Sequence, residues 1–298
     1  MNIRKMMLSG ALLVLFSLTA VAQTDVPLAD PYILTEDGTY YAYGTHAADG
    51  IECFTSTDLK TWQTAGLALS RANTTEERWF WAPEVYKRGD TFYMFYSANE
   101  HLYVATSTSP TGPFRQRGGL LMQALIGNEK CIDSSVIFDD DGRAYLFFVR
   151  FTDGNFIWMC DLSDDLMPVP GTLRPCFGAK EPWETHLGKV AEGPFVIKRR
   201  GVYYLTYSAN DFRSPDYGVG YATSKSIHGP WTKAAENPIL SHHKGRIGTG
   251  HHSLFTDKRG RLYIVYHAHY SATEVYPRMM YIEPIQFKRG KLLVPNKR

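Results

Sequence analysis

The chain has 298 residues, of which 44% are hydrophobic and 14% aromatic, and its formal net charge is +2. The 32 basic residues include Arg4 and Lys5, which lie in an N-terminal segment set apart below, so the rest of the chain holds as many basic as acidic residues. This balance excludes nucleic acid as the implied partner, because proteins that bind nucleic acid usually carry a basic surplus.

The first 22 residues, MNIRKMMLSGALLVLFSLTAVA, have the pattern of a secretory signal peptide. A basic start precedes an apolar run, and Ala20 and Ala22 form a cleavage-like ending. The run is too short for a convincing membrane span, and no cysteine follows it to carry a lipid anchor. We therefore expect a mature chain that begins near Gln23, is exported to the periplasm or the extracellular space, and does not insert into the membrane.

Residues 23–298 predict a single all-β domain built from repeats. One phrase recurs five times, as DPYILTEDGTYYAYGT, APEVYKRGDTFYMFYSA, DSSVIFDDDGRAYLFFV, GPFVIKRRGVYYLTYSA and HHSLFTDKRGRLYIVYHA. Each copy predicts a strand, a turn and a strand, because its turn carries the Gly or Asp that a tight hairpin needs for positive φ. Apolar and aromatic residues then alternate, as in a half-buried strand.

Aligning the repeats gives the architecture. It places Pro31, Pro83, Ser134, Pro194 and His252 in register, at periods of 52, 51, 60 and 58 residues. Five copies at this period predict a five-bladed β-propeller. Further strand signals between the copies, such as LYVATSTSPTGPFRQ, would complete four strands per blade.

Ionisable residues stand at the starts of the repeats. The innermost strand of each propeller blade lines the central channel, so these starts converge on one end of the axis. There stand Asp30, the segment Trp81–Glu84, Asp133, Glu192 and His251. An Asp before Pro or Ser is also a common turn residue, so any one of these acids alone favours a structural role. Three acids at equivalent positions of three blades favour a catalytic site.

These motifs resemble those of glycoside hydrolase family 43, the five-bladed propeller enzymes that act on arabinose- and xylose-containing glycans. The similarity lies in ADPYI, WAPEV, IDSSVIFDDDG, AEGPF and GTGH, which occur in this order at blade spacing. Any one motif is weak, whereas the ordered set is specific. The resemblance implies an inverting glycosidase with a carbohydrate substrate.

The resemblance also implies three catalytic roles. Asp30 matches the general base, which activates a water for attack on the anomeric carbon, and Glu192 matches the general acid, which protonates the departing oxygen. Asp133 matches the third acid, which orients Glu192 and raises its pKa by like-charge repulsion. Inversion by this pair implies a separation of roughly 6.5 to 9.5 Å between the two carboxyl groups.

Three further residues are implied to contact the sugar. Trp81 matches an aromatic wall beside the sugar subsite, and Arg278 matches an arginine that contacts the terminal sugar. His251, in GTGH, matches a histidine on the propeller axis that often helps to order a hydrated calcium ion. We therefore expect no required cofactor, but a candidate structural calcium that His251 reaches through ordered water. Glu84 matches no catalytic position, and we interpret it as a structural or rim acid.

The substrate is an expectation from the resemblance alone. We expect an exo-acting α-L-arabinofuranosidase or β-D-xylosidase for plant polysaccharides or oligosaccharides, without the C-terminal β-sandwich of the family's two-domain β-xylosidases. A β-D-galactofuranosidase is a related alternative. A catalytically silent carbohydrate-binding propeller is an alternative from another class, which the presence of all three acids disfavours. A retaining fructan enzyme would need Asn-Asp-Pro where this chain has Ala-Asp-Pro.

The four cysteines, Cys53, Cys131, Cys160 and Cys176, match no zinc motif. In an exported chain they could form a bridge or remain buried thiols, and their spacing does not decide between the two. We expect the protein to be a monomer.

Overall fold

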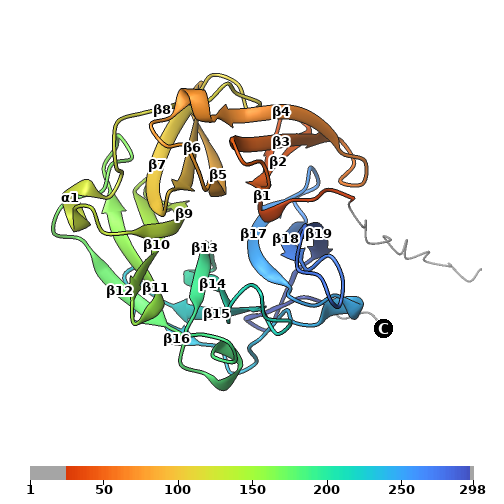
Figure 1. Ribbon diagram of the computed structural model, residues 1–298. Coiled ribbons are helices and arrows are strands. Elements are labelled where there is room, and N and C mark those ends of the chain that lie inside the picture. The colour runs from red at the N-terminus through yellow and green to blue at the C-terminus, as the bar shows by residue number, and fades with distance from the viewer. Residues whose placement is uncertain (1–24, 296–298) are drawn as a thin grey trace, which may run out of the picture.

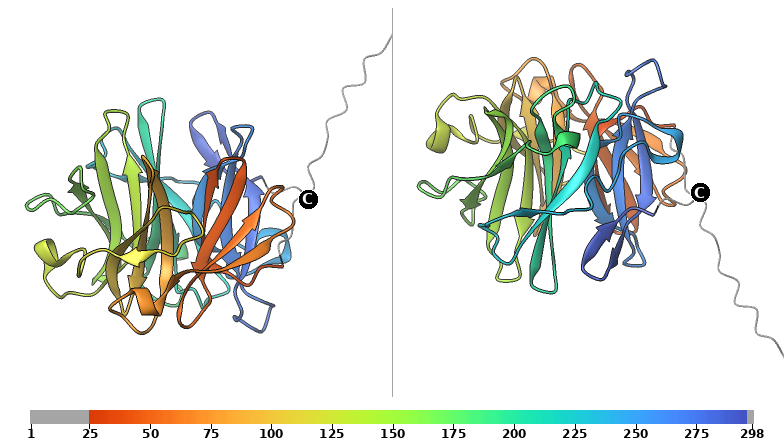
Figure 2. Two further views of the ribbon diagram at one scale, coloured as in Figure 1. Left: turned by 90° about the horizontal axis from the view of Figure 1, so that it is seen from above. Right: turned by 90° about the horizontal axis from the view of Figure 1, so that it is seen from below.

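A computed structural model of the protein describes residues 25–295. The predicted signal peptide, residues 1–22, and the predicted mature start at Gln23 lie outside the described residues. The described chain forms a five-bladed β-propeller, as the repeats predict (Figure 1). Seen from the side, the strands run roughly along the axis and the connecting loops gather at its two ends (Figure 2).

Each blade is an antiparallel sheet whose strands follow chain order outward from the axis. The first two blades comprise β1 (Ala29–Glu36), β2 (Thr39–Thr45), β3 (Gly50–Ser56), β4 (Gln63–Ser70), β5 (Trp81–Arg88), β6 (Thr91–Ala98), β7 (His101–Ser107) and β8 (Arg115–Gln116). The next two comprise β9 (Cys131–Phe138), β10 (Ala144–Thr152), β11 (Gly154–Leu162), β12 (Arg174–Gly178), β13 (Ala191–Arg199), β14 (Val202–Ala209), β15 (Gly218–Ser224) and β16 (Thr232–Lys233). The fifth blade comprises β17 (Gly250–Thr256), β18 (Leu262–Ala268) and β19 (Met279–Pro284).

The remaining elements are short. A hairpin of β20 (Gln286–Lys288) and β21 (Lys291–Leu293) follows the fifth blade, and the helical turns are η1 (Arg71–Asn73), α1 (Gln123–Ile126), η2 (Pro182–Glu184) and η3 (His243–Gly245). None of the helices among residues 25–295 has the length and apolar character needed to cross a bilayer. All four cysteines lie within this part of the chain as free thiols.

The fifth blade has three strands rather than the expected four, and the start of the described chain packs along its outer edge. The backbone N–H of Met280 in β19 donates a hydrogen bond of 3.0 Å to the carbonyl oxygen of Val26. Val26 and Leu28 pack in one hydrophobic cluster with Val265 and Met280. The segment before β1 therefore covers the edge that β19 would otherwise expose, which closes the ring of blades.

The hydrophobic core is divided among the interfaces between blades. Five clusters of buried side chains each join two neighbouring blades. The alternation along β6 shows the cause: Phe92 and Met94 pack toward the first blade, whereas Phe95 packs toward the third. Because successive strand residues point to opposite faces, one apolar strand serves two interfaces.

The first strand of every blade carries a β-bulge near its start. Pairing with the second strand is interrupted there, and the bulge residue has positive φ at Asp30 (49°), Ala82 (44°), Asp133 (58°), Gly193 (52°) and His251 (40°). A left-handed conformation costs a residue other than glycine roughly 1 kcal/mol or more, and such strain is typical of functional sites. A bulge bends the strand and re-aims its side chains, here at the end of the axis.

The positions of the bulges correct the expectation that all three acids stand at equivalent places in their blades. Asp30 and Asp133 occupy equivalent positions, as expected, but Glu192 does not. Glu192 stands one residue earlier, where the second blade has Trp81, and Gly193 takes the bulge position. Glycine suits this position because the ring of His251 lies against it: a Cβ on Gly193 would be 3.1 Å from the Cδ2 atom of His251, which is a tight contact.

Candidate active site

A pocket of about 600 Å³ is lined by residues at the starts of the inner strands. All six residues predicted for the site line it, namely Asp30, Trp81, Asp133, Glu192, His251 and Arg278. The pocket has the size of a ligand site. Residues from all five blades thus meet at one place, which the propeller geometry explains.

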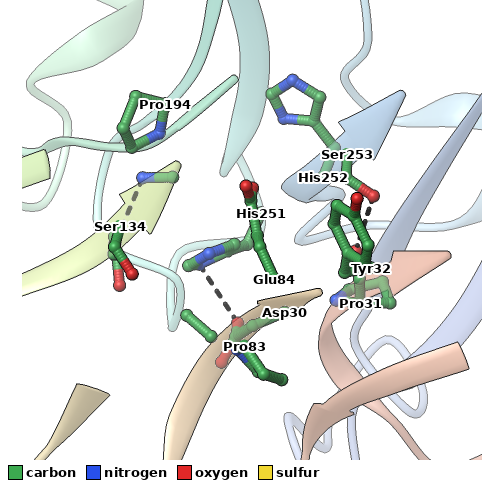
Figure 3. Close-up of a pocket in the computed structure, with 13 residues that line it drawn as sticks. Asp30, Pro31, Tyr32, Pro83, Glu84, Ser134, Pro194, His251, His252 and Ser253 are labelled. Atoms are coloured by element: carbon green, nitrogen blue, oxygen red, sulfur yellow. Dashed lines mark hydrogen bonds and ion pairs between the residues drawn. The ribbon is translucent and has the colours of Figure 1, made fainter. Parts of the chain in front are cut away.

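A second, much smaller cavity of about 10 Å³ lies on the axis and is lined by residues at and just after the bulges (Figure 3). The hydroxyl of Ser134, which lines it, is buried and has no hydrogen-bond partner. Glu84 also lines this cavity; it accepts a hydrogen bond from Tyr86, and burial raises its pKa to about 8. Glu84 is therefore a buried structural acid rather than a rim acid.

Asp30 is surrounded by cationic and imidazole groups. The Nη1 of Arg278 donates to its Oδ1 at 2.9 Å, and the Nδ1 atoms of His251 and His267 lie 3.2 and 3.3 Å from the same oxygen. Burial alone would raise the pKa of Asp30, but Arg278, His251 and His267 together outweigh it, so the pKa lies well below the ordinary value. Asp30 is therefore held as a carboxylate.

Glu192 is buried and accepts two hydrogen bonds. The Tyr217 hydroxyl donates to Oε1 and the Asn155 side-chain amide donates to Oε2, each at 2.8 Å. Burial raises the pKa of Glu192 to about 7, although both hydrogen bonds act to lower it. Glu192 can therefore hold a proton near neutral pH.

Asp133 lies beside Glu192 without bonding its carboxyl group. Its Oδ2 accepts a hydrogen bond of 3.1 Å from the backbone N–H of Gly193, and its own N–H donates to the hydroxyl of Ser97. Burial raises the pKa of Asp133 well above its ordinary value, and the negative charges of Glu192 and Asp30 raise it further. Asp133 and Glu192 thus titrate as a coupled pair.

A stack of two rings connects the surroundings of Asp30 and Glu192. The rings of Tyr217 and His267 are stacked, with centroids 5.6 Å apart and an interplanar angle of 15°. Tyr217 also leaves no space for a side chain at Gly250, where a Cβ would be 2.3 Å from the tyrosine ring. The first strand of the fifth blade can approach this stack only because it begins with glycine.

Trp81 forms one wall of the pocket and is supported from behind. Its ring stacks on that of Trp79 at 5.6 Å, and the guanidinium of Arg78 lies 4.1 Å from the centre of the Trp79 ring. Trp79 is 41% exposed, whereas the Trp81 ring reaches the pocket. Trp79 is thus a packed surface tryptophan that supports the wall.

Sequence reasoning missed three residues of the site: Asn155, Tyr217 and His267. They come from the second and third strands of their blades and the loops between them, not from the inner strands to which the motifs belong. No local pattern marks Asn155 or Tyr217. His267 lies in the fifth repeat, where YHA stands in place of YSA in the second and fourth, and this difference was the available signal.

The described side chains do not form a metal cage. Among residues 25–295, no three His, Cys, Asp or Glu groups come together in an arrangement that could hold a metal ion. The Nδ1 of His251 is already within 3.2 Å of Asp30. Calcium prefers six to eight oxygen ligands, so an ion near His251 would be held largely by water molecules.

Comparison with known proteins gives a consistent assignment. The model of the family described as glycosyl hydrolases family 43 matches residues 23–292. A solved structure named endo-1,4-β-xylanase, from Bacteroides thetaiotaomicron, is 46% identical, with a TM-score of 0.88 over 93% of this chain and 97% of that one. A thermostable family-43 glycoside hydrolase is 34% identical, with a TM-score of 0.86 over 94% and 96% of the two chains.

Curated relatives share less of the sequence. The β-D-galactofuranosidase of Aspergillus niger is 29% identical over 81% of this chain and 74% of its own length. Others are named as an arabinan endo-1,5-α-L-arabinosidase, an endo-α-(1→5)-L-arabinanase, an exo-α-(1→5)-L-arabinofuranosidase and a xylosidase/arabinosidase. Two of these relatives are named as extracellular.

Proposed function

Because this chain belongs to family 43 of the glycosyl hydrolases, we propose that it is an exo-acting enzyme that removes terminal α-L-arabinofuranosyl or β-D-xylosyl units from plant polysaccharides or oligosaccharides. The chain is an inverting glycosidase, like its relatives, and its substrate is a carbohydrate. The particular sugar, the exo mode and the residue roles are what we propose.

One observation carries the catalytic assignment. Two buried carboxyl groups in one pocket have pKa values that are shifted in opposite directions: Asp30 downward by Arg278 and the histidines, against burial, and Glu192 upward by burial. Two titratable groups in one site whose pKa values are shifted apart in this way are typical of a general base and a general acid. At neutral pH Asp30 is ready to accept a proton while Glu192 can give one.

The reaction follows from these two states. Asp30 accepts a proton from a water molecule as the water oxygen bonds to the anomeric carbon. Glu192 gives its proton to the glycosidic oxygen as the bond from that oxygen to the anomeric carbon breaks. The product has the opposite anomeric configuration, Asp30 ends protonated and Glu192 ends ionised. Proton exchange with solvent restores both groups.

Asp133 acts on Glu192 in two ways in this proposal. Its negative charge favours the protonated form of Glu192, and its hydrogen bond to the Gly193 N–H fixes the backbone next to the acid. Trp81 provides the aromatic wall for the sugar ring, while Arg278 and His251 contact the terminal sugar from beside Asp30.

The names of the relatives support a pentose substrate. The structure that is 46% identical is named as a xylanase, and a curated relative from Cellvibrio japonicus is named as an exo-α-(1→5)-L-arabinofuranosidase. A second candidate is β-D-galactofuranosidase activity, which the relative from Aspergillus niger favours. D-galactofuranose and L-arabinofuranose share a ring form, so one pocket can discriminate poorly between them.

A structural calcium near His251 also remains a proposal. The axial cavity of about 10 Å³ has no room for a hydrated ion, so an ion beside His251 would lie in the larger pocket, which His251 also lines, with water molecules completing its coordination. None of the steps above passes through this ion.

The substrate is tested with 4-nitrophenyl α-L-arabinofuranoside, β-D-xylopyranoside and β-D-galactofuranoside. We expect one of the two pentosides to be hydrolysed with the highest kcat/KM. A preference for the galactofuranoside would favour the second candidate, and no cleavage of any of the three would overturn both.

The mode of attack is tested by product size. On xylohexaose or linear arabinan, an exo enzyme releases monosaccharide from the first turnover. Early release of di- or trisaccharides would instead assign an endo mode.

A further inference from the structure

The hairpin formed by β10 and β11 extends beyond the start of β9, the inner strand of the same blade. Both strands have nine residues, whereas the second and third strands of the other blades have six to eight. Arg150 pairs with Cys131, the first residue of β9, so the chain from Phe151 onward extends beyond the start of that strand.

Phe151 and Asn155 lie at this extended end. They are direct partners in the antiparallel register, so their side chains lie on the same face of the hairpin. Both line the large pocket, and the Asn155 amide donates to Oε2 of Glu192. Phe151 thus stands next to the residue that holds the predicted acid.

Phe151 is also exposed to solvent over 43% of its surface. Two further aromatic residues of the pocket, Phe212 and Tyr276, contact each other, and the Phe212 ring lies 4.6 Å from the guanidinium of Arg278. Arg278 binds Asp30, so that pair belongs to the side of the base. Phe151 is therefore an exposed aromatic side chain beside the predicted acid.

The hairpin end is fixed in position relative to Glu192. The Asn155 N–H donates to the carbonyl oxygen of Lys189 at 2.9 Å, in the segment that leads into β13. Gly154 has φ of 73°, and a Cβ there would lie 2.0 Å from the same carbonyl oxygen. Because the backbone at Gly154 and Asn155 packs closely against Lys189, the hairpin end that carries Phe151 is fixed in position.

We infer that Phe151 forms the platform on which the leaving-group sugar stacks, and that this sugar is a pyranosyl ring. A general acid must contact the glycosidic oxygen, so the leaving group lies beside Glu192 and Asn155. A pyranosyl ring presents a face of C–H groups, and the flat apolar ring of Phe151 matches it. The inference rests on the proposed function, because it assigns a subsite of the same pocket.

The test compares leaving groups with and without a ring. For the pentose that the wild type cleaves, kcat/KM is measured on the glycoside that links this pentose to a xylopyranosyl unit, and on the glycosyl fluoride of the same pentose. Fluoride places no ring on the platform. Phe151→Ala should lower kcat/KM about tenfold on the first substrate and change it less than twofold on the fluoride. Phe151→Tyr, which keeps the ring, should restore most of the loss.

Met167→Ala is the matched control. Met167 is an apolar residue of the same blade, 39% exposed and outside the pocket, so its variant should behave as the wild type on both substrates. Equal losses of Phe151→Ala on both substrates, or no loss on either, would overturn the inference while leaving the proposed function standing. A wild type that cleaves neither substrate would overturn the proposed function and this inference with it.

Discussion

Burial and four neighbouring side chains set the protonation of Glu192. Burial is the largest cause and raises the pKa of Glu192, and the negative charges of Asp30 and Asp211 raise it further, whereas the hydrogen bonds that Tyr217 and Asn155 donate lower it. The pKa of about 7 results from burial together with these contributions. The alkaline limb of kcat/KM against pH should therefore lie near neutrality, while the low pKa of Asp30 places the acid limb well below it.

Replacing Asp133 by Asn should move the alkaline limb to lower pH. Asn can still accept the hydrogen bond from Gly193, so the change removes the charge and keeps the contact. Loss of the like charge lowers the pKa of Glu192 by about one unit, which corresponds to about 1.4 kcal/mol. The measurement is kcat/KM against pH for both proteins. An unchanged rate and profile would show that Asp133 only caps the strand start.

Replacing Tyr217 by Phe should move the same limb to higher pH. The ring, with its stack on His267, is retained, and only the hydroxyl that donates to Glu192 is lost. The carboxylate loses a donor, so the pKa of Glu192 rises. Tyr204→Phe is the control, because the Tyr204 hydroxyl bonds the carbonyl oxygen of Gly290, which is not among the residues lining the pocket. A shift of equal size in the control, or none in Tyr217→Phe, would contradict this positioning role.

At the scale of single elements, the bulged inner strands determine where the side chains of the site point. Each bulge lies at the residue before the position that the repeats align, from Pro31 to His252. The sequence repeats predicted the strands and their order, because apolar alternation and hairpin turns are local signals. They did not predict the bulges, since positive φ at Asp30, Asp133 and His251 is imposed by tertiary contacts on residues that are not glycine. The register of the repeats already sets Glu192 two residues before Pro194, whereas Asp30 and Asp133 stand one residue before Pro31 and Ser134, and treating the three acids as equivalent overlooked this offset.

Gly250 at the start of β17 gives a test of this packing. A Cβ there would overlap the ring of Tyr217, so Gly250→Ala should displace the ring from Glu192 and destabilise the fold by about 1–3 kcal/mol. Activity should fall more than tenfold. Gly201→Ala is the control: its φ is 75° but nothing lies within 4 Å of the added Cβ, so it should cost about 1 kcal/mol and leave kcat/KM unchanged. Denaturant unfolding and kcat/KM of both variants decide the matter, and a fully active Gly250→Ala would refute the close packing.

At the scale of the whole molecule, the ring of blades brings residues from distant parts of the chain to one pocket. Asp30 and Arg278 are 248 positions apart and form an ion pair, because the segment around Val26 closes the ring against the last blade. Five of the six predicted site residues could be found from the sequence because they lie at the starts of the repeats, whereas Arg278 was implied only by the resemblance to family 43. Asn155, Tyr217 and His267 could not be assigned roles in the same way, because their contacts depend on how neighbouring blades and loops pack. Export and the monomeric state remain predictions, and the mature start near Gln23 lies outside the described residues.

The central claim is that Glu192 is the acid and Asp30 the base of a single displacement. The most direct measurement is kcat/KM of Glu192→Ala and Asp30→Ala on a natural oligosaccharide and on the 2,4-dinitrophenyl glycoside of the same sugar. The activated leaving group needs little protonation, so Glu192→Ala should lose at least a hundredfold more activity on the oligosaccharide than on the aryl glycoside. Asp30→Ala should lose activity on both, because the attacking water needs a base in either case. Equal losses of Glu192→Ala on the two substrates, or an active Asp30→Ala, would contradict the account.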